Sequence, residues 1–202
     1  MAKFEVCCHS FADLSEHNYG VSILNDSKYG FATVGNVMRL SLLRSPKAPD
    51  GNADMGSHQI RWAMMPHRGG LGAQTVQAAR NFNNPLRLYK GEKSMHSDLY
   101  KQPIVLKGDA NLVLDWVKRG EDDEDVSTDN LPRRGEQSII VRVYDAVGGM
   151  GRGTIETTFA VKKAFKTNIL EDDLEEMAVQ DGIFDIVLAP FEVSTFRLVL
   201  ES

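Results

Sequence analysis

The chain has 202 residues, of which 42% are hydrophobic, and it carries a formal net charge of −5 with a pI near 5.5. This length allows one large domain or two small ones, and the hydrophobic fraction supports a packed core. The acidic balance leaves no basic stripe for a nucleic acid, so we expect no such partner.

The two cysteines, Cys7 and Cys8, are adjacent. Neighbouring cysteines rarely bridge each other, so we expect no disulfide framework and a reducing compartment. No apolar run reaches the ~18–20 residues of a membrane-spanning helix, and "MAKFEVCCHS" lacks the long apolar stretch of a signal peptide. We therefore expect a protein without membrane contacts.

Most of the first third of the chain alternates with period two, which is typical of strands. On the strand "NVMRLSLLR", Met38, Leu40 and Leu42 share one face, and the next residue on that face is Arg44. The expected elements are a strand over 19–26, a turn-rich connection over 28–36, a strand over 36–44, a loop over 45–56 and a strand over 58–66.

The middle of the chain holds the one short helix that we expect. Apolar and alanine residues in "LGAQTVQAARNFNNPL" (71–86) recur at helical spacing, and Asn83-Asn84-Pro85 closes the segment. "QPIVLKG" and "ANLVLDWVKRG" again read as strands. The following acidic stretch, "EDDEDVSTDNLPRRGEQ", is interpreted as a solvated surface loop, because it lacks the spaced ligands and mid-loop glycine of a calcium-binding loop.

The last third of the chain is again rich in strands. "SIIVRVYDA" and "TIETTFAVKKA" flank the glycine-rich "VGGMGRG", which we predict to be a hairpin turn rather than a phosphate-binding loop, because a strand follows it. The acidic segment 167–182 suggests a helical turn around Leu174, and 183–190 and 191–201 suggest a final strand pair. Strands outnumber helices, so the predicted class is mainly β, with packed sheets.

Catalytic motifs are absent from the sequence. None of the five histidines forms a spaced metal-binding pair on a helix, and no serine lies in a G-x-S-x-G elbow. Asp13 and Asp26 lie in or near expected turns, where aspartate is favoured for local backbone hydrogen bonds. From the residues alone, the sequence predicts a β-rich module and little more.

Several motifs carry a more specific resemblance: "ADLSE", "GVSILNDSKYG", "LSLLRSPKAPD", "RVYDAVGGMGRGTIETTF" and "LAPFEVSTFRL". Together they closely resemble the C-terminal β region of glycoside hydrolase family 38 α-mannosidases, in the cytosolic and vacuolar branch of fungi and animals. The resemblance implies part of a large β-sandwich (a supersandwich) over 1–119, the acidic loop over 120–136 and a small terminal β-sandwich over 137–202.

The resemblance also implies what this chain lacks. Family members are several times longer, and their aspartate nucleophile and metal ligands belong to an N-terminal α/β catalytic domain that nothing here matches. We therefore expect no catalytic residue and no metal or other cofactor in this chain, which would be inactive alone. The parent enzyme would use a divalent metal, zinc or similar, in its catalytic domain.

By the same resemblance, counted from Gly35, Arg44 would reach into the sugar-binding pocket of the parent. A guanidinium fork suits the binding of hydroxyls or the orientation of a carboxylate. The alternative is a strand-end arginine that pairs with a carboxylate such as Asp50. The resemblance further suggests substrate contacts for Asp26, Lys28 and Tyr29 and, more weakly, for Asp13.

Three functions compete. The chain could be the C-terminal domain of an α-mannosidase, whose partners would be its own catalytic domain and mannose-containing oligosaccharides, in a homo-oligomer of the cytoplasm or vacuole. It could be a stand-alone carbohydrate-binding module, which presents aromatic rings to sugars. Trp62 and Trp116 argue against this, because alternation places both beside apolar residues in the core. The third candidate is an oligomerisation module that pairs through exposed strand edges.

Overall fold

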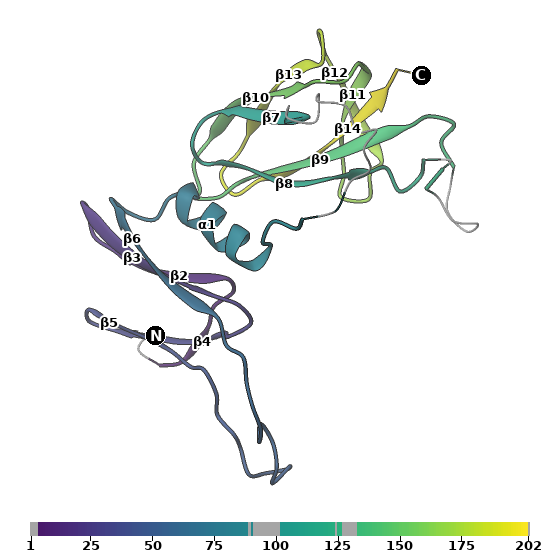
Figure 1. Ribbon diagram of the computed structural model, residues 1–202. Coiled ribbons are helices and arrows are strands. Elements are labelled where there is room, and N and C mark those ends of the chain that lie inside the picture. The colour runs from purple at the N-terminus through teal and green to yellow at the C-terminus, as the bar shows by residue number, and fades with distance from the viewer. Residues whose placement is uncertain (1–3, 89, 91–101, 124, 127–132, 202) are drawn as a thin grey trace. The chain divides into compact units, whose positions relative to one another are not determined.

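A computed structural model describes residues 4–88, 90, 102–123, 125–126 and 133–201 (Figure 1). The chain divides into two units, Met1–Leu88 and Tyr89–Ser202. This division differs from the one expected at residue 119. The strand before the acidic loop pairs with the strand after it, so the charged loop joins two strands of one sheet. None of the helices in the described part of the chain is long and apolar enough to cross a bilayer.

The first unit contains two three-stranded sheets and the helix. One sheet has the order β2-β3-β6 and lies between α1 and the β4–β5 hairpin; the other has the order β1-β4-β5 (Figure 1). The elements are β1 (Val6–Cys7), β2 (Phe11–Ser15), β3 (Tyr19–Asn25), β4 (Gly30–Val34), β5 (Val37–Leu40), β6 (Trp62–Arg68) and α1 (Ala73–Asn83).

The helix is confirmed, and two strand predictions in this unit are corrected. The segment expected as a turn-rich connection contains β4, because its glycines lie at the strand's start and just beyond its end rather than inside it. Val34 pairs with Val37, which leaves Gly35 (φ 59°) and Asn36 as a two-residue hairpin turn. β5 ends at Leu40 rather than at Arg44, so the residues from Ser41 onward lie outside the strand.

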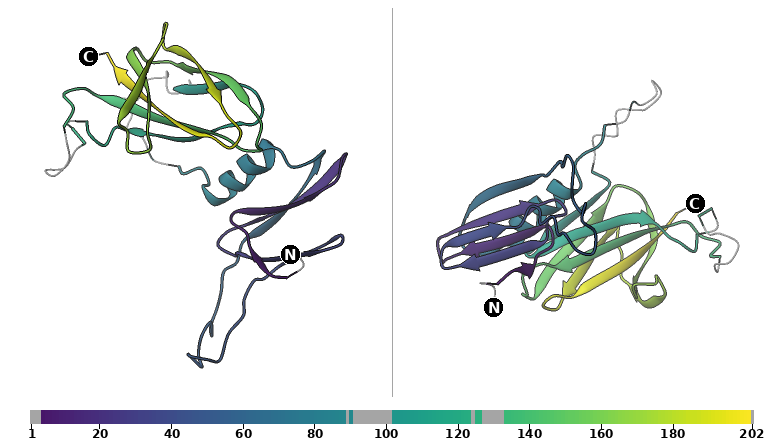
Figure 2. Two further views of the ribbon diagram at one scale, coloured as in Figure 1. Left: turned by 180° about the vertical axis from the view of Figure 1, so that it is seen from behind. Right: turned by 90° about the horizontal axis from the view of Figure 1, so that it is seen from below.

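The second unit is a β-sandwich, which we call the terminal sandwich. Its two antiparallel sheets stack as layers, with the orders β13-β10-β7 and β12-β11-β14-β9-β8 (Figures 1 and 2). The strands are β7 (Ile104–Gly108), β8 (Leu112–Arg119), β9 (Ser138–Asp145), β10 (Gly151–Thr157), β11 (Val161–Thr167), β12 (Asp173–Met177), β13 (Ile183–Leu188) and β14 (Val193–Leu200).

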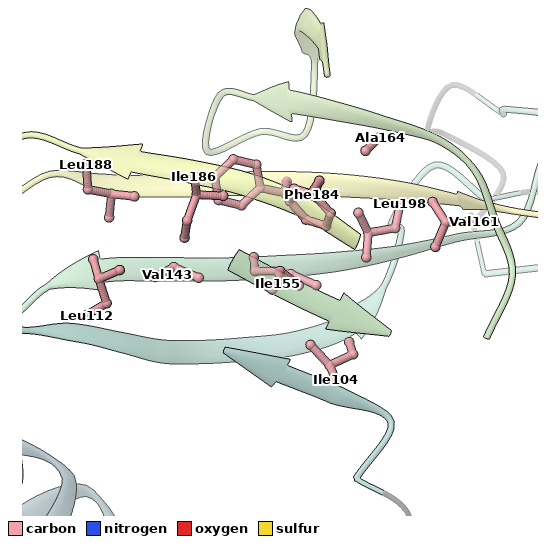
Figure 3. Packing of buried hydrophobic residues seen from close by; sticks show 12 residues of the cluster. Ile104, Leu112, Val143, Ile155, Val161, Ala164, Phe184, Ile186, Leu188 and Leu198 are labelled. Atoms are coloured by element: carbon pink, nitrogen blue, oxygen red, sulfur yellow. The ribbon is translucent and has the colours of Figure 1, made fainter. Parts of the chain in front are cut away.

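The core of the terminal sandwich lies between these sheets. Phe184, Ile186 and Leu188 alternate along β13 and point into the space between the sheets, beside Ile155 of the neighbouring strand β10 and toward Val143 of the facing sheet (Figure 3). Phe184 also meets the ring of a phenylalanine of β14 edge-on. Such burial removes apolar surface from water and is the main stabilising contribution in a sandwich of this kind. The mainly β class is therefore confirmed, with a terminal β-sandwich and a short helix.

Four expectations about this unit are wrong. The stretch 147–153 is not a hairpin turn, because β9 pairs with β8 and β14 whereas β10 pairs with β7 and β13, so the chain crosses between the sheets. For the same reason β13 and β14 do not pair with each other. The expected strand over 154–164 is divided between β10 and β11, and Leu174 lies in strand β12 rather than in a helical turn.

The expectation that both tryptophans lie in the core is also wrong. Trp62 is 54% exposed and Trp116 is 58% exposed. Trp62 lies on β6, an edge strand that pairs only with β3 in the described part of the chain. Trp116 follows an irregularity in the pairing of β8 with β9, which turns its side chain to the outer face.

Candidate functional site

The β3–β4 connection carries three of the residues predicted to contact substrate: Asp26, Lys28 and Tyr29. A buried asparagine at the end of β3, Asn25, shapes it: its Oδ1 accepts the backbone N–H of Lys28 at 3.1 Å. Ser27 between them adopts φ 69°. This Asx-type turn leaves Tyr29 45% exposed, with its ring centroid 4.5 Å from that of His9.

Asp26 is engaged by an arginine that sequence reasoning did not single out. The Nε of Arg61 donates to the carboxylate of Asp26 at 2.9 Å, and its Nη2 donates to the carbonyl of Phe82 at 2.7 Å. The guanidinium also lies 4.9 Å from the centroid of the Phe82 ring. Both charged side chains are about half exposed, at 52% and 41%. Nothing in the sequence spacing could have paired residues 35 positions apart.

Arg44 lies on the extended segment that leaves β5. The N–H of Ser41 donates to the carbonyl of Gly30 at 2.8 Å, so this segment starts beside the residue that follows Tyr29. Arg44 is exposed, and no hydrogen bond or ion pair joins it to any residue that the structure describes. Asp50, the alternative partner, accepts the N–H of Asn52 instead. The proposed contact of Arg44 with substrate stays a prediction.

Asp13 lies in strand β2 rather than in a turn, and its carboxylate is buried on the face of the sheet that meets α1. It accepts hydrogen bonds from Ser22 and from His67 Nε2, the latter at 2.6 Å. Ser22 also contacts Thr75 of α1 at 3.3 Å. Asp13 is thus apart from the other predicted site residues, on the opposite side of its sheet from the β4–β5 hairpin. Its contact with substrate stays a prediction.

The charge state of Asp13 follows from these partners. Burial alone would raise the pKa of Asp13. Hydrogen bonds from Ser22, Ser15 and His67 outweigh that effect, and the pKa of this carboxyl lies below its usual value. Asp13 is therefore ionised in the folded protein and holds the buried imidazole of His67 in place.

A glycine makes room for this buried pair. Gly20 pairs with His67 across β3 and β6, and a Cβ at Gly20 would lie 2.3 Å from the imidazole ring. Gly20→Ala should displace His67 from Asp13 and lower the free energy of unfolding of the first unit by about 3 kcal/mol. Urea unfolding in a Trp116→Phe background, where Trp62 is the remaining tryptophan, measures this loss.

The matched control for this substitution is Gly70→Ala. The added Cβ there meets nothing closer than 4.0 Å, so we expect a change within about 0.5 kcal/mol. Equal effects of the two alanines would contradict a packed contact at His67.

The opposite face of the β2-β3-β6 sheet is apolar and partly open to solvent. A groove of about 540 Å³ runs between this sheet and the β4–β5 hairpin. Tyr19 and Met64 are 52% and 65% exposed, and Met64 pairs directly with Ile23. The groove is lined by Leu14, Tyr19, Val21, Ile23, Met38 and Met64, among others. A sheet face with this composition is typical of a surface that another layer covers.

Metal ligands do not gather anywhere in the part of the chain that the structure describes. No group of three or more histidine, cysteine, aspartate and glutamate side chains there could hold a metal ion. Cys7 and Cys8 are both free thiols. Burial is the main reason why the pKa of the Cys8 thiol is raised, which favours an unreactive thiol.

Two family profiles match the chain. The profile described as the glycosyl hydrolases family 38 C-terminal domain matches residues 1–52, and that of the family 38 C-terminal beta sandwich domain matches residues 111–196.

Individual proteins are similar over nearly the whole chain. An alpha-mannosidase of Saccharomyces cerevisiae is 48% identical over 207 residues, which cover 98% of this chain and 19% of that protein. Alpha-mannosidase 2C1 of Homo sapiens is 34% identical over 203 residues, which cover 99% of this chain and 18% of that protein. Alpha-mannosidase G of Dictyostelium discoideum is 34% identical over 204 residues, which cover 98% of this chain and 18% of that protein. The chain thus spans about a fifth of the length of these relatives.

Proposed function

Because this chain belongs to the C-terminal region of glycoside hydrolase family 38, we propose that it is the non-catalytic C-terminal part of an α-mannosidase, which hydrolyses terminal α-mannose residues. On this proposal the chain scaffolds the catalytic part of the same polypeptide and adds residues to its pocket. The observation that carries the proposal is the open apolar face of the β2-β3-β6 sheet, which calls for a covering layer that the described residues of the first unit do not supply.

The proposed covering layer is the preceding part of the parent polypeptide. The relatives extend over about five times the length of this chain, which leaves ample sequence for it. Burying half-exposed side chains such as Met64 and Trp62 under such a layer would contribute roughly 1–3 kcal/mol each. This gain supports a permanent attachment within one polypeptide.

The proposed pocket residues are Arg44 and the β3–β4 connection. Arg44 is exposed and has no protein partner among the described residues, so its guanidinium is available to hydroxyl groups of a sugar. The β3–β4 connection, with Asp26, Lys28 and Tyr29, would line the same side of the proposed sugar pocket. Arg61 orients Asp26 there. Asp13 is proposed as a weaker substrate contact, and from within the sheet it also holds His67 in place.

The reaction chemistry is assigned elsewhere in the parent. The described residues do not fit a metal ion, so we derive no step through one here. The divalent metal, proposed as zinc or a similar ion, and the nucleophile would lie in the catalytic part. We further propose mannose-containing oligosaccharides as the substrates of the parent, a homo-oligomeric parent and a cytoplasmic or vacuolar location.

A split-enzyme assay tests this function. The 202-residue chain alone should give no turnover of a chromogenic α-mannoside, and turnover should appear when the preceding part of the parent is co-expressed with it. Met64→Lys should reduce recovered activity at least about tenfold, because it places a charge in the buried interface. Leu174→Lys on the terminal sandwich is the control, since both side chains are 65% exposed. Turnover by the chain alone, or equal loss in both variants, would refute the proposal.

A further inference from the structure

The outer face of the terminal sandwich carries an exposed tryptophan that a local irregularity places there. In the pairing of β8 with β9, Leu114 faces Val143 and Trp116 faces Arg142, which leaves Asp115 as one extra residue. Without this β-bulge, alternation from the core residue Leu112 would point Trp116 inward. The bulge instead exposes 58% of a large aromatic side chain on the solvent face.

A second irregularity forms the wall opposite Trp116. The β11–β12 connection has Glu171 in the left-handed region at φ 71°, although its side chain is buried. The carboxylate of Glu171 forms an ion pair with Lys118 Nζ at 2.6 Å and accepts a hydrogen bond from the backbone N–H of Glu121 at 2.9 Å. This attachment pins the connection to β8. Backbone strain of this kind persists where the surroundings fix it, and it gathers at binding sites.

The β11–β12 connection exposes two apolar side chains to solvent. Ile169 is 69% exposed and Leu170 is 76% exposed. Asn168 Oδ1 accepts the N–H groups of both Leu170 and Asp172, and its Nδ2 donates to Asp172 Oδ2, so the connection is internally braced. Together with Trp116 these side chains border a groove of about 630 Å³, which is within the usual size range of small-molecule sites.

Polar groups in the groove are available and pre-oriented. Arg142 faces Trp116 across the strand pair, and its Nε donates to Thr195 Oγ1 at 3.1 Å. The two terminal nitrogens of that guanidinium make no hydrogen bond to any residue that the structure describes. Asp122 and Asp172 add carboxylates to the same wall.

The balance of charge in the groove favours a neutral ligand over an anionic one. The groove has two cations, Lys118 and Arg142, against the three carboxylates of Glu121, Asp122 and Asp172. Lys118 is already engaged by Glu121 and by the buried Glu171. A phosphate would meet net repulsion, whereas a neutral polyol can donate its hydroxyls to the carboxylates and accept from the guanidinium.

We propose that this groove, between Trp116 and the β11–β12 connection, is a non-catalytic binding site for a hexopyranose unit of an oligosaccharide. Trp116 offers an aromatic plane to the C–H face of the sugar ring, and Arg142 and Asp172 bind its hydroxyls. The site lies entirely within the terminal sandwich. Only the choice of mannose as a first ligand rests on the proposed function.

Isothermal titration of the 202-residue chain with methyl α-D-mannopyranoside and mannobiose tests the site. Saturable binding is expected with a dissociation constant in the millimolar range or tighter. Trp116→Ala should weaken it at least about tenfold, and Arg142→Met should weaken it as well, whereas Trp62→Ala should leave it unchanged. Trp62 is the matched control because it is a similarly exposed tryptophan of the other unit.

Several results would overturn the site: no saturation at tens of millimolar of any methyl hexoside, binding that survives Trp116→Ala, or binding that Trp62→Ala abolishes. Shielding of Trp116 from acrylamide quenching in the assembled parent without sugar would instead identify a protein contact. Methyl glucoside and methyl galactoside, titrated in parallel, assign the preferred hexose. The titration needs no catalysis, so its outcome is independent of the split-enzyme assay.

Discussion

Replacing Asp145 with alanine should lower the free energy of unfolding of the terminal sandwich by about 4 kcal/mol. The carboxylate is 3% exposed and accepts four N–H groups. The side chain of Asn111 and the backbone N–H groups of Gly148 and Phe191 each donate at 2.7 Å, and that of Val147 donates at 3.4 Å. These bonds tie together two connections at one end of the sandwich, and alanine would leave their donors without an acceptor.

The isosteric variant Asp145→Asn should also be destabilising. Oδ1 serves Asn111 and Val147, while Oδ2 serves Gly148 and Phe191. Either orientation of an asparagine amide would therefore set its NH₂ group against two N–H donors. Asp145→Asn should therefore lose nearly as much unfolding free energy as Asp145→Ala. If only the shape of the side chain mattered, asparagine would be tolerated.

The pH dependence of this contribution has a definite sign. Burial would raise the pKa of Asp145, but the hydrogen bonds from Phe191, Asn111, Gly148 and Val147 outweigh it and hold the pKa below its usual value. A lowered folded pKa means that the stabilisation is complete above the unfolded pKa of about 3.9 and is lost as the pH falls through the folded value. The gap between wild type and Asp145→Asn should therefore narrow below about pH 4.

Urea unfolding in a Trp62→Phe background measures these effects, because Trp116 is then the remaining tryptophan and lies in the terminal sandwich. Asp185→Ala is the control: this carboxylate is exposed on β13 and accepts one side-chain bond, from Thr154, so a loss below about 1 kcal/mol is expected. If Asp145→Ala also lost less than about 1 kcal/mol, water would be replacing the Asp145 carboxylate as hydrogen-bond acceptor, and the prediction would be wrong.

Alternation predicted the strands well where one face of a strand is buried. Along β13, Phe184, Ile186 and Leu188 are buried and the residues between them are exposed, which is the pattern that period two describes. Strand partners were not predictable in this way. The glycines of 147–153 and the short 189–192 segment both suggest hairpins, yet each connects the two sheets, because pairing is decided by distant strands.

Local irregularities account for the other differences. One inserted residue, Asp115, reverses every later side chain of β8, and this reversal exposes Trp116. The left-handed backbone at Glu171 is equally invisible to a pattern of apolar residues. The groove that we propose as a sugar site depends on both irregularities, so alternation alone predicted a core tryptophan where the structure has an exposed one.

The predicted pocket residues could be named only through the family resemblance. For Arg44 the resemblance implied a sugar ligand, and the alternative was an ion pair with a carboxylate such as Asp50. The absence of that ion pair among the described residues removes the second without testing the first. Arg61, which orients Asp26, has no sequence signal, because its partner lies on the connection after β3 and becomes its neighbour only when β6 pairs with β3.

Arg44→Ala in the parent enzyme should lower kcat/KM for an α-mannoside by about 10- to 100-fold. This range corresponds to the roughly 1.5–3 kcal/mol that a hydrogen bond from a charged group contributes. The kcat/KM of Arg44→Lys should lie between those of wild type and Arg44→Ala, because lysine keeps the charge but not the planar fork that holds two hydroxyls. The expectation rests on the proposed function and on the exposed position of Arg44 beyond β5.

Arg39→Ala is the matched control, since Arg39 is an exposed arginine within β5 itself, and its kcat/KM should stay within about twofold of wild type. Assembly of each variant with the catalytic part is measured alongside by size-exclusion chromatography. A loss of activity that tracks a loss of assembly would make Arg44 an interface residue, whereas unchanged kcat/KM would make it a surface arginine without a role. Only a loss of activity in a fully assembled enzyme assigns the guanidinium to the pocket, because Arg44 has no partner among the described residues of its own chain whose removal could explain it.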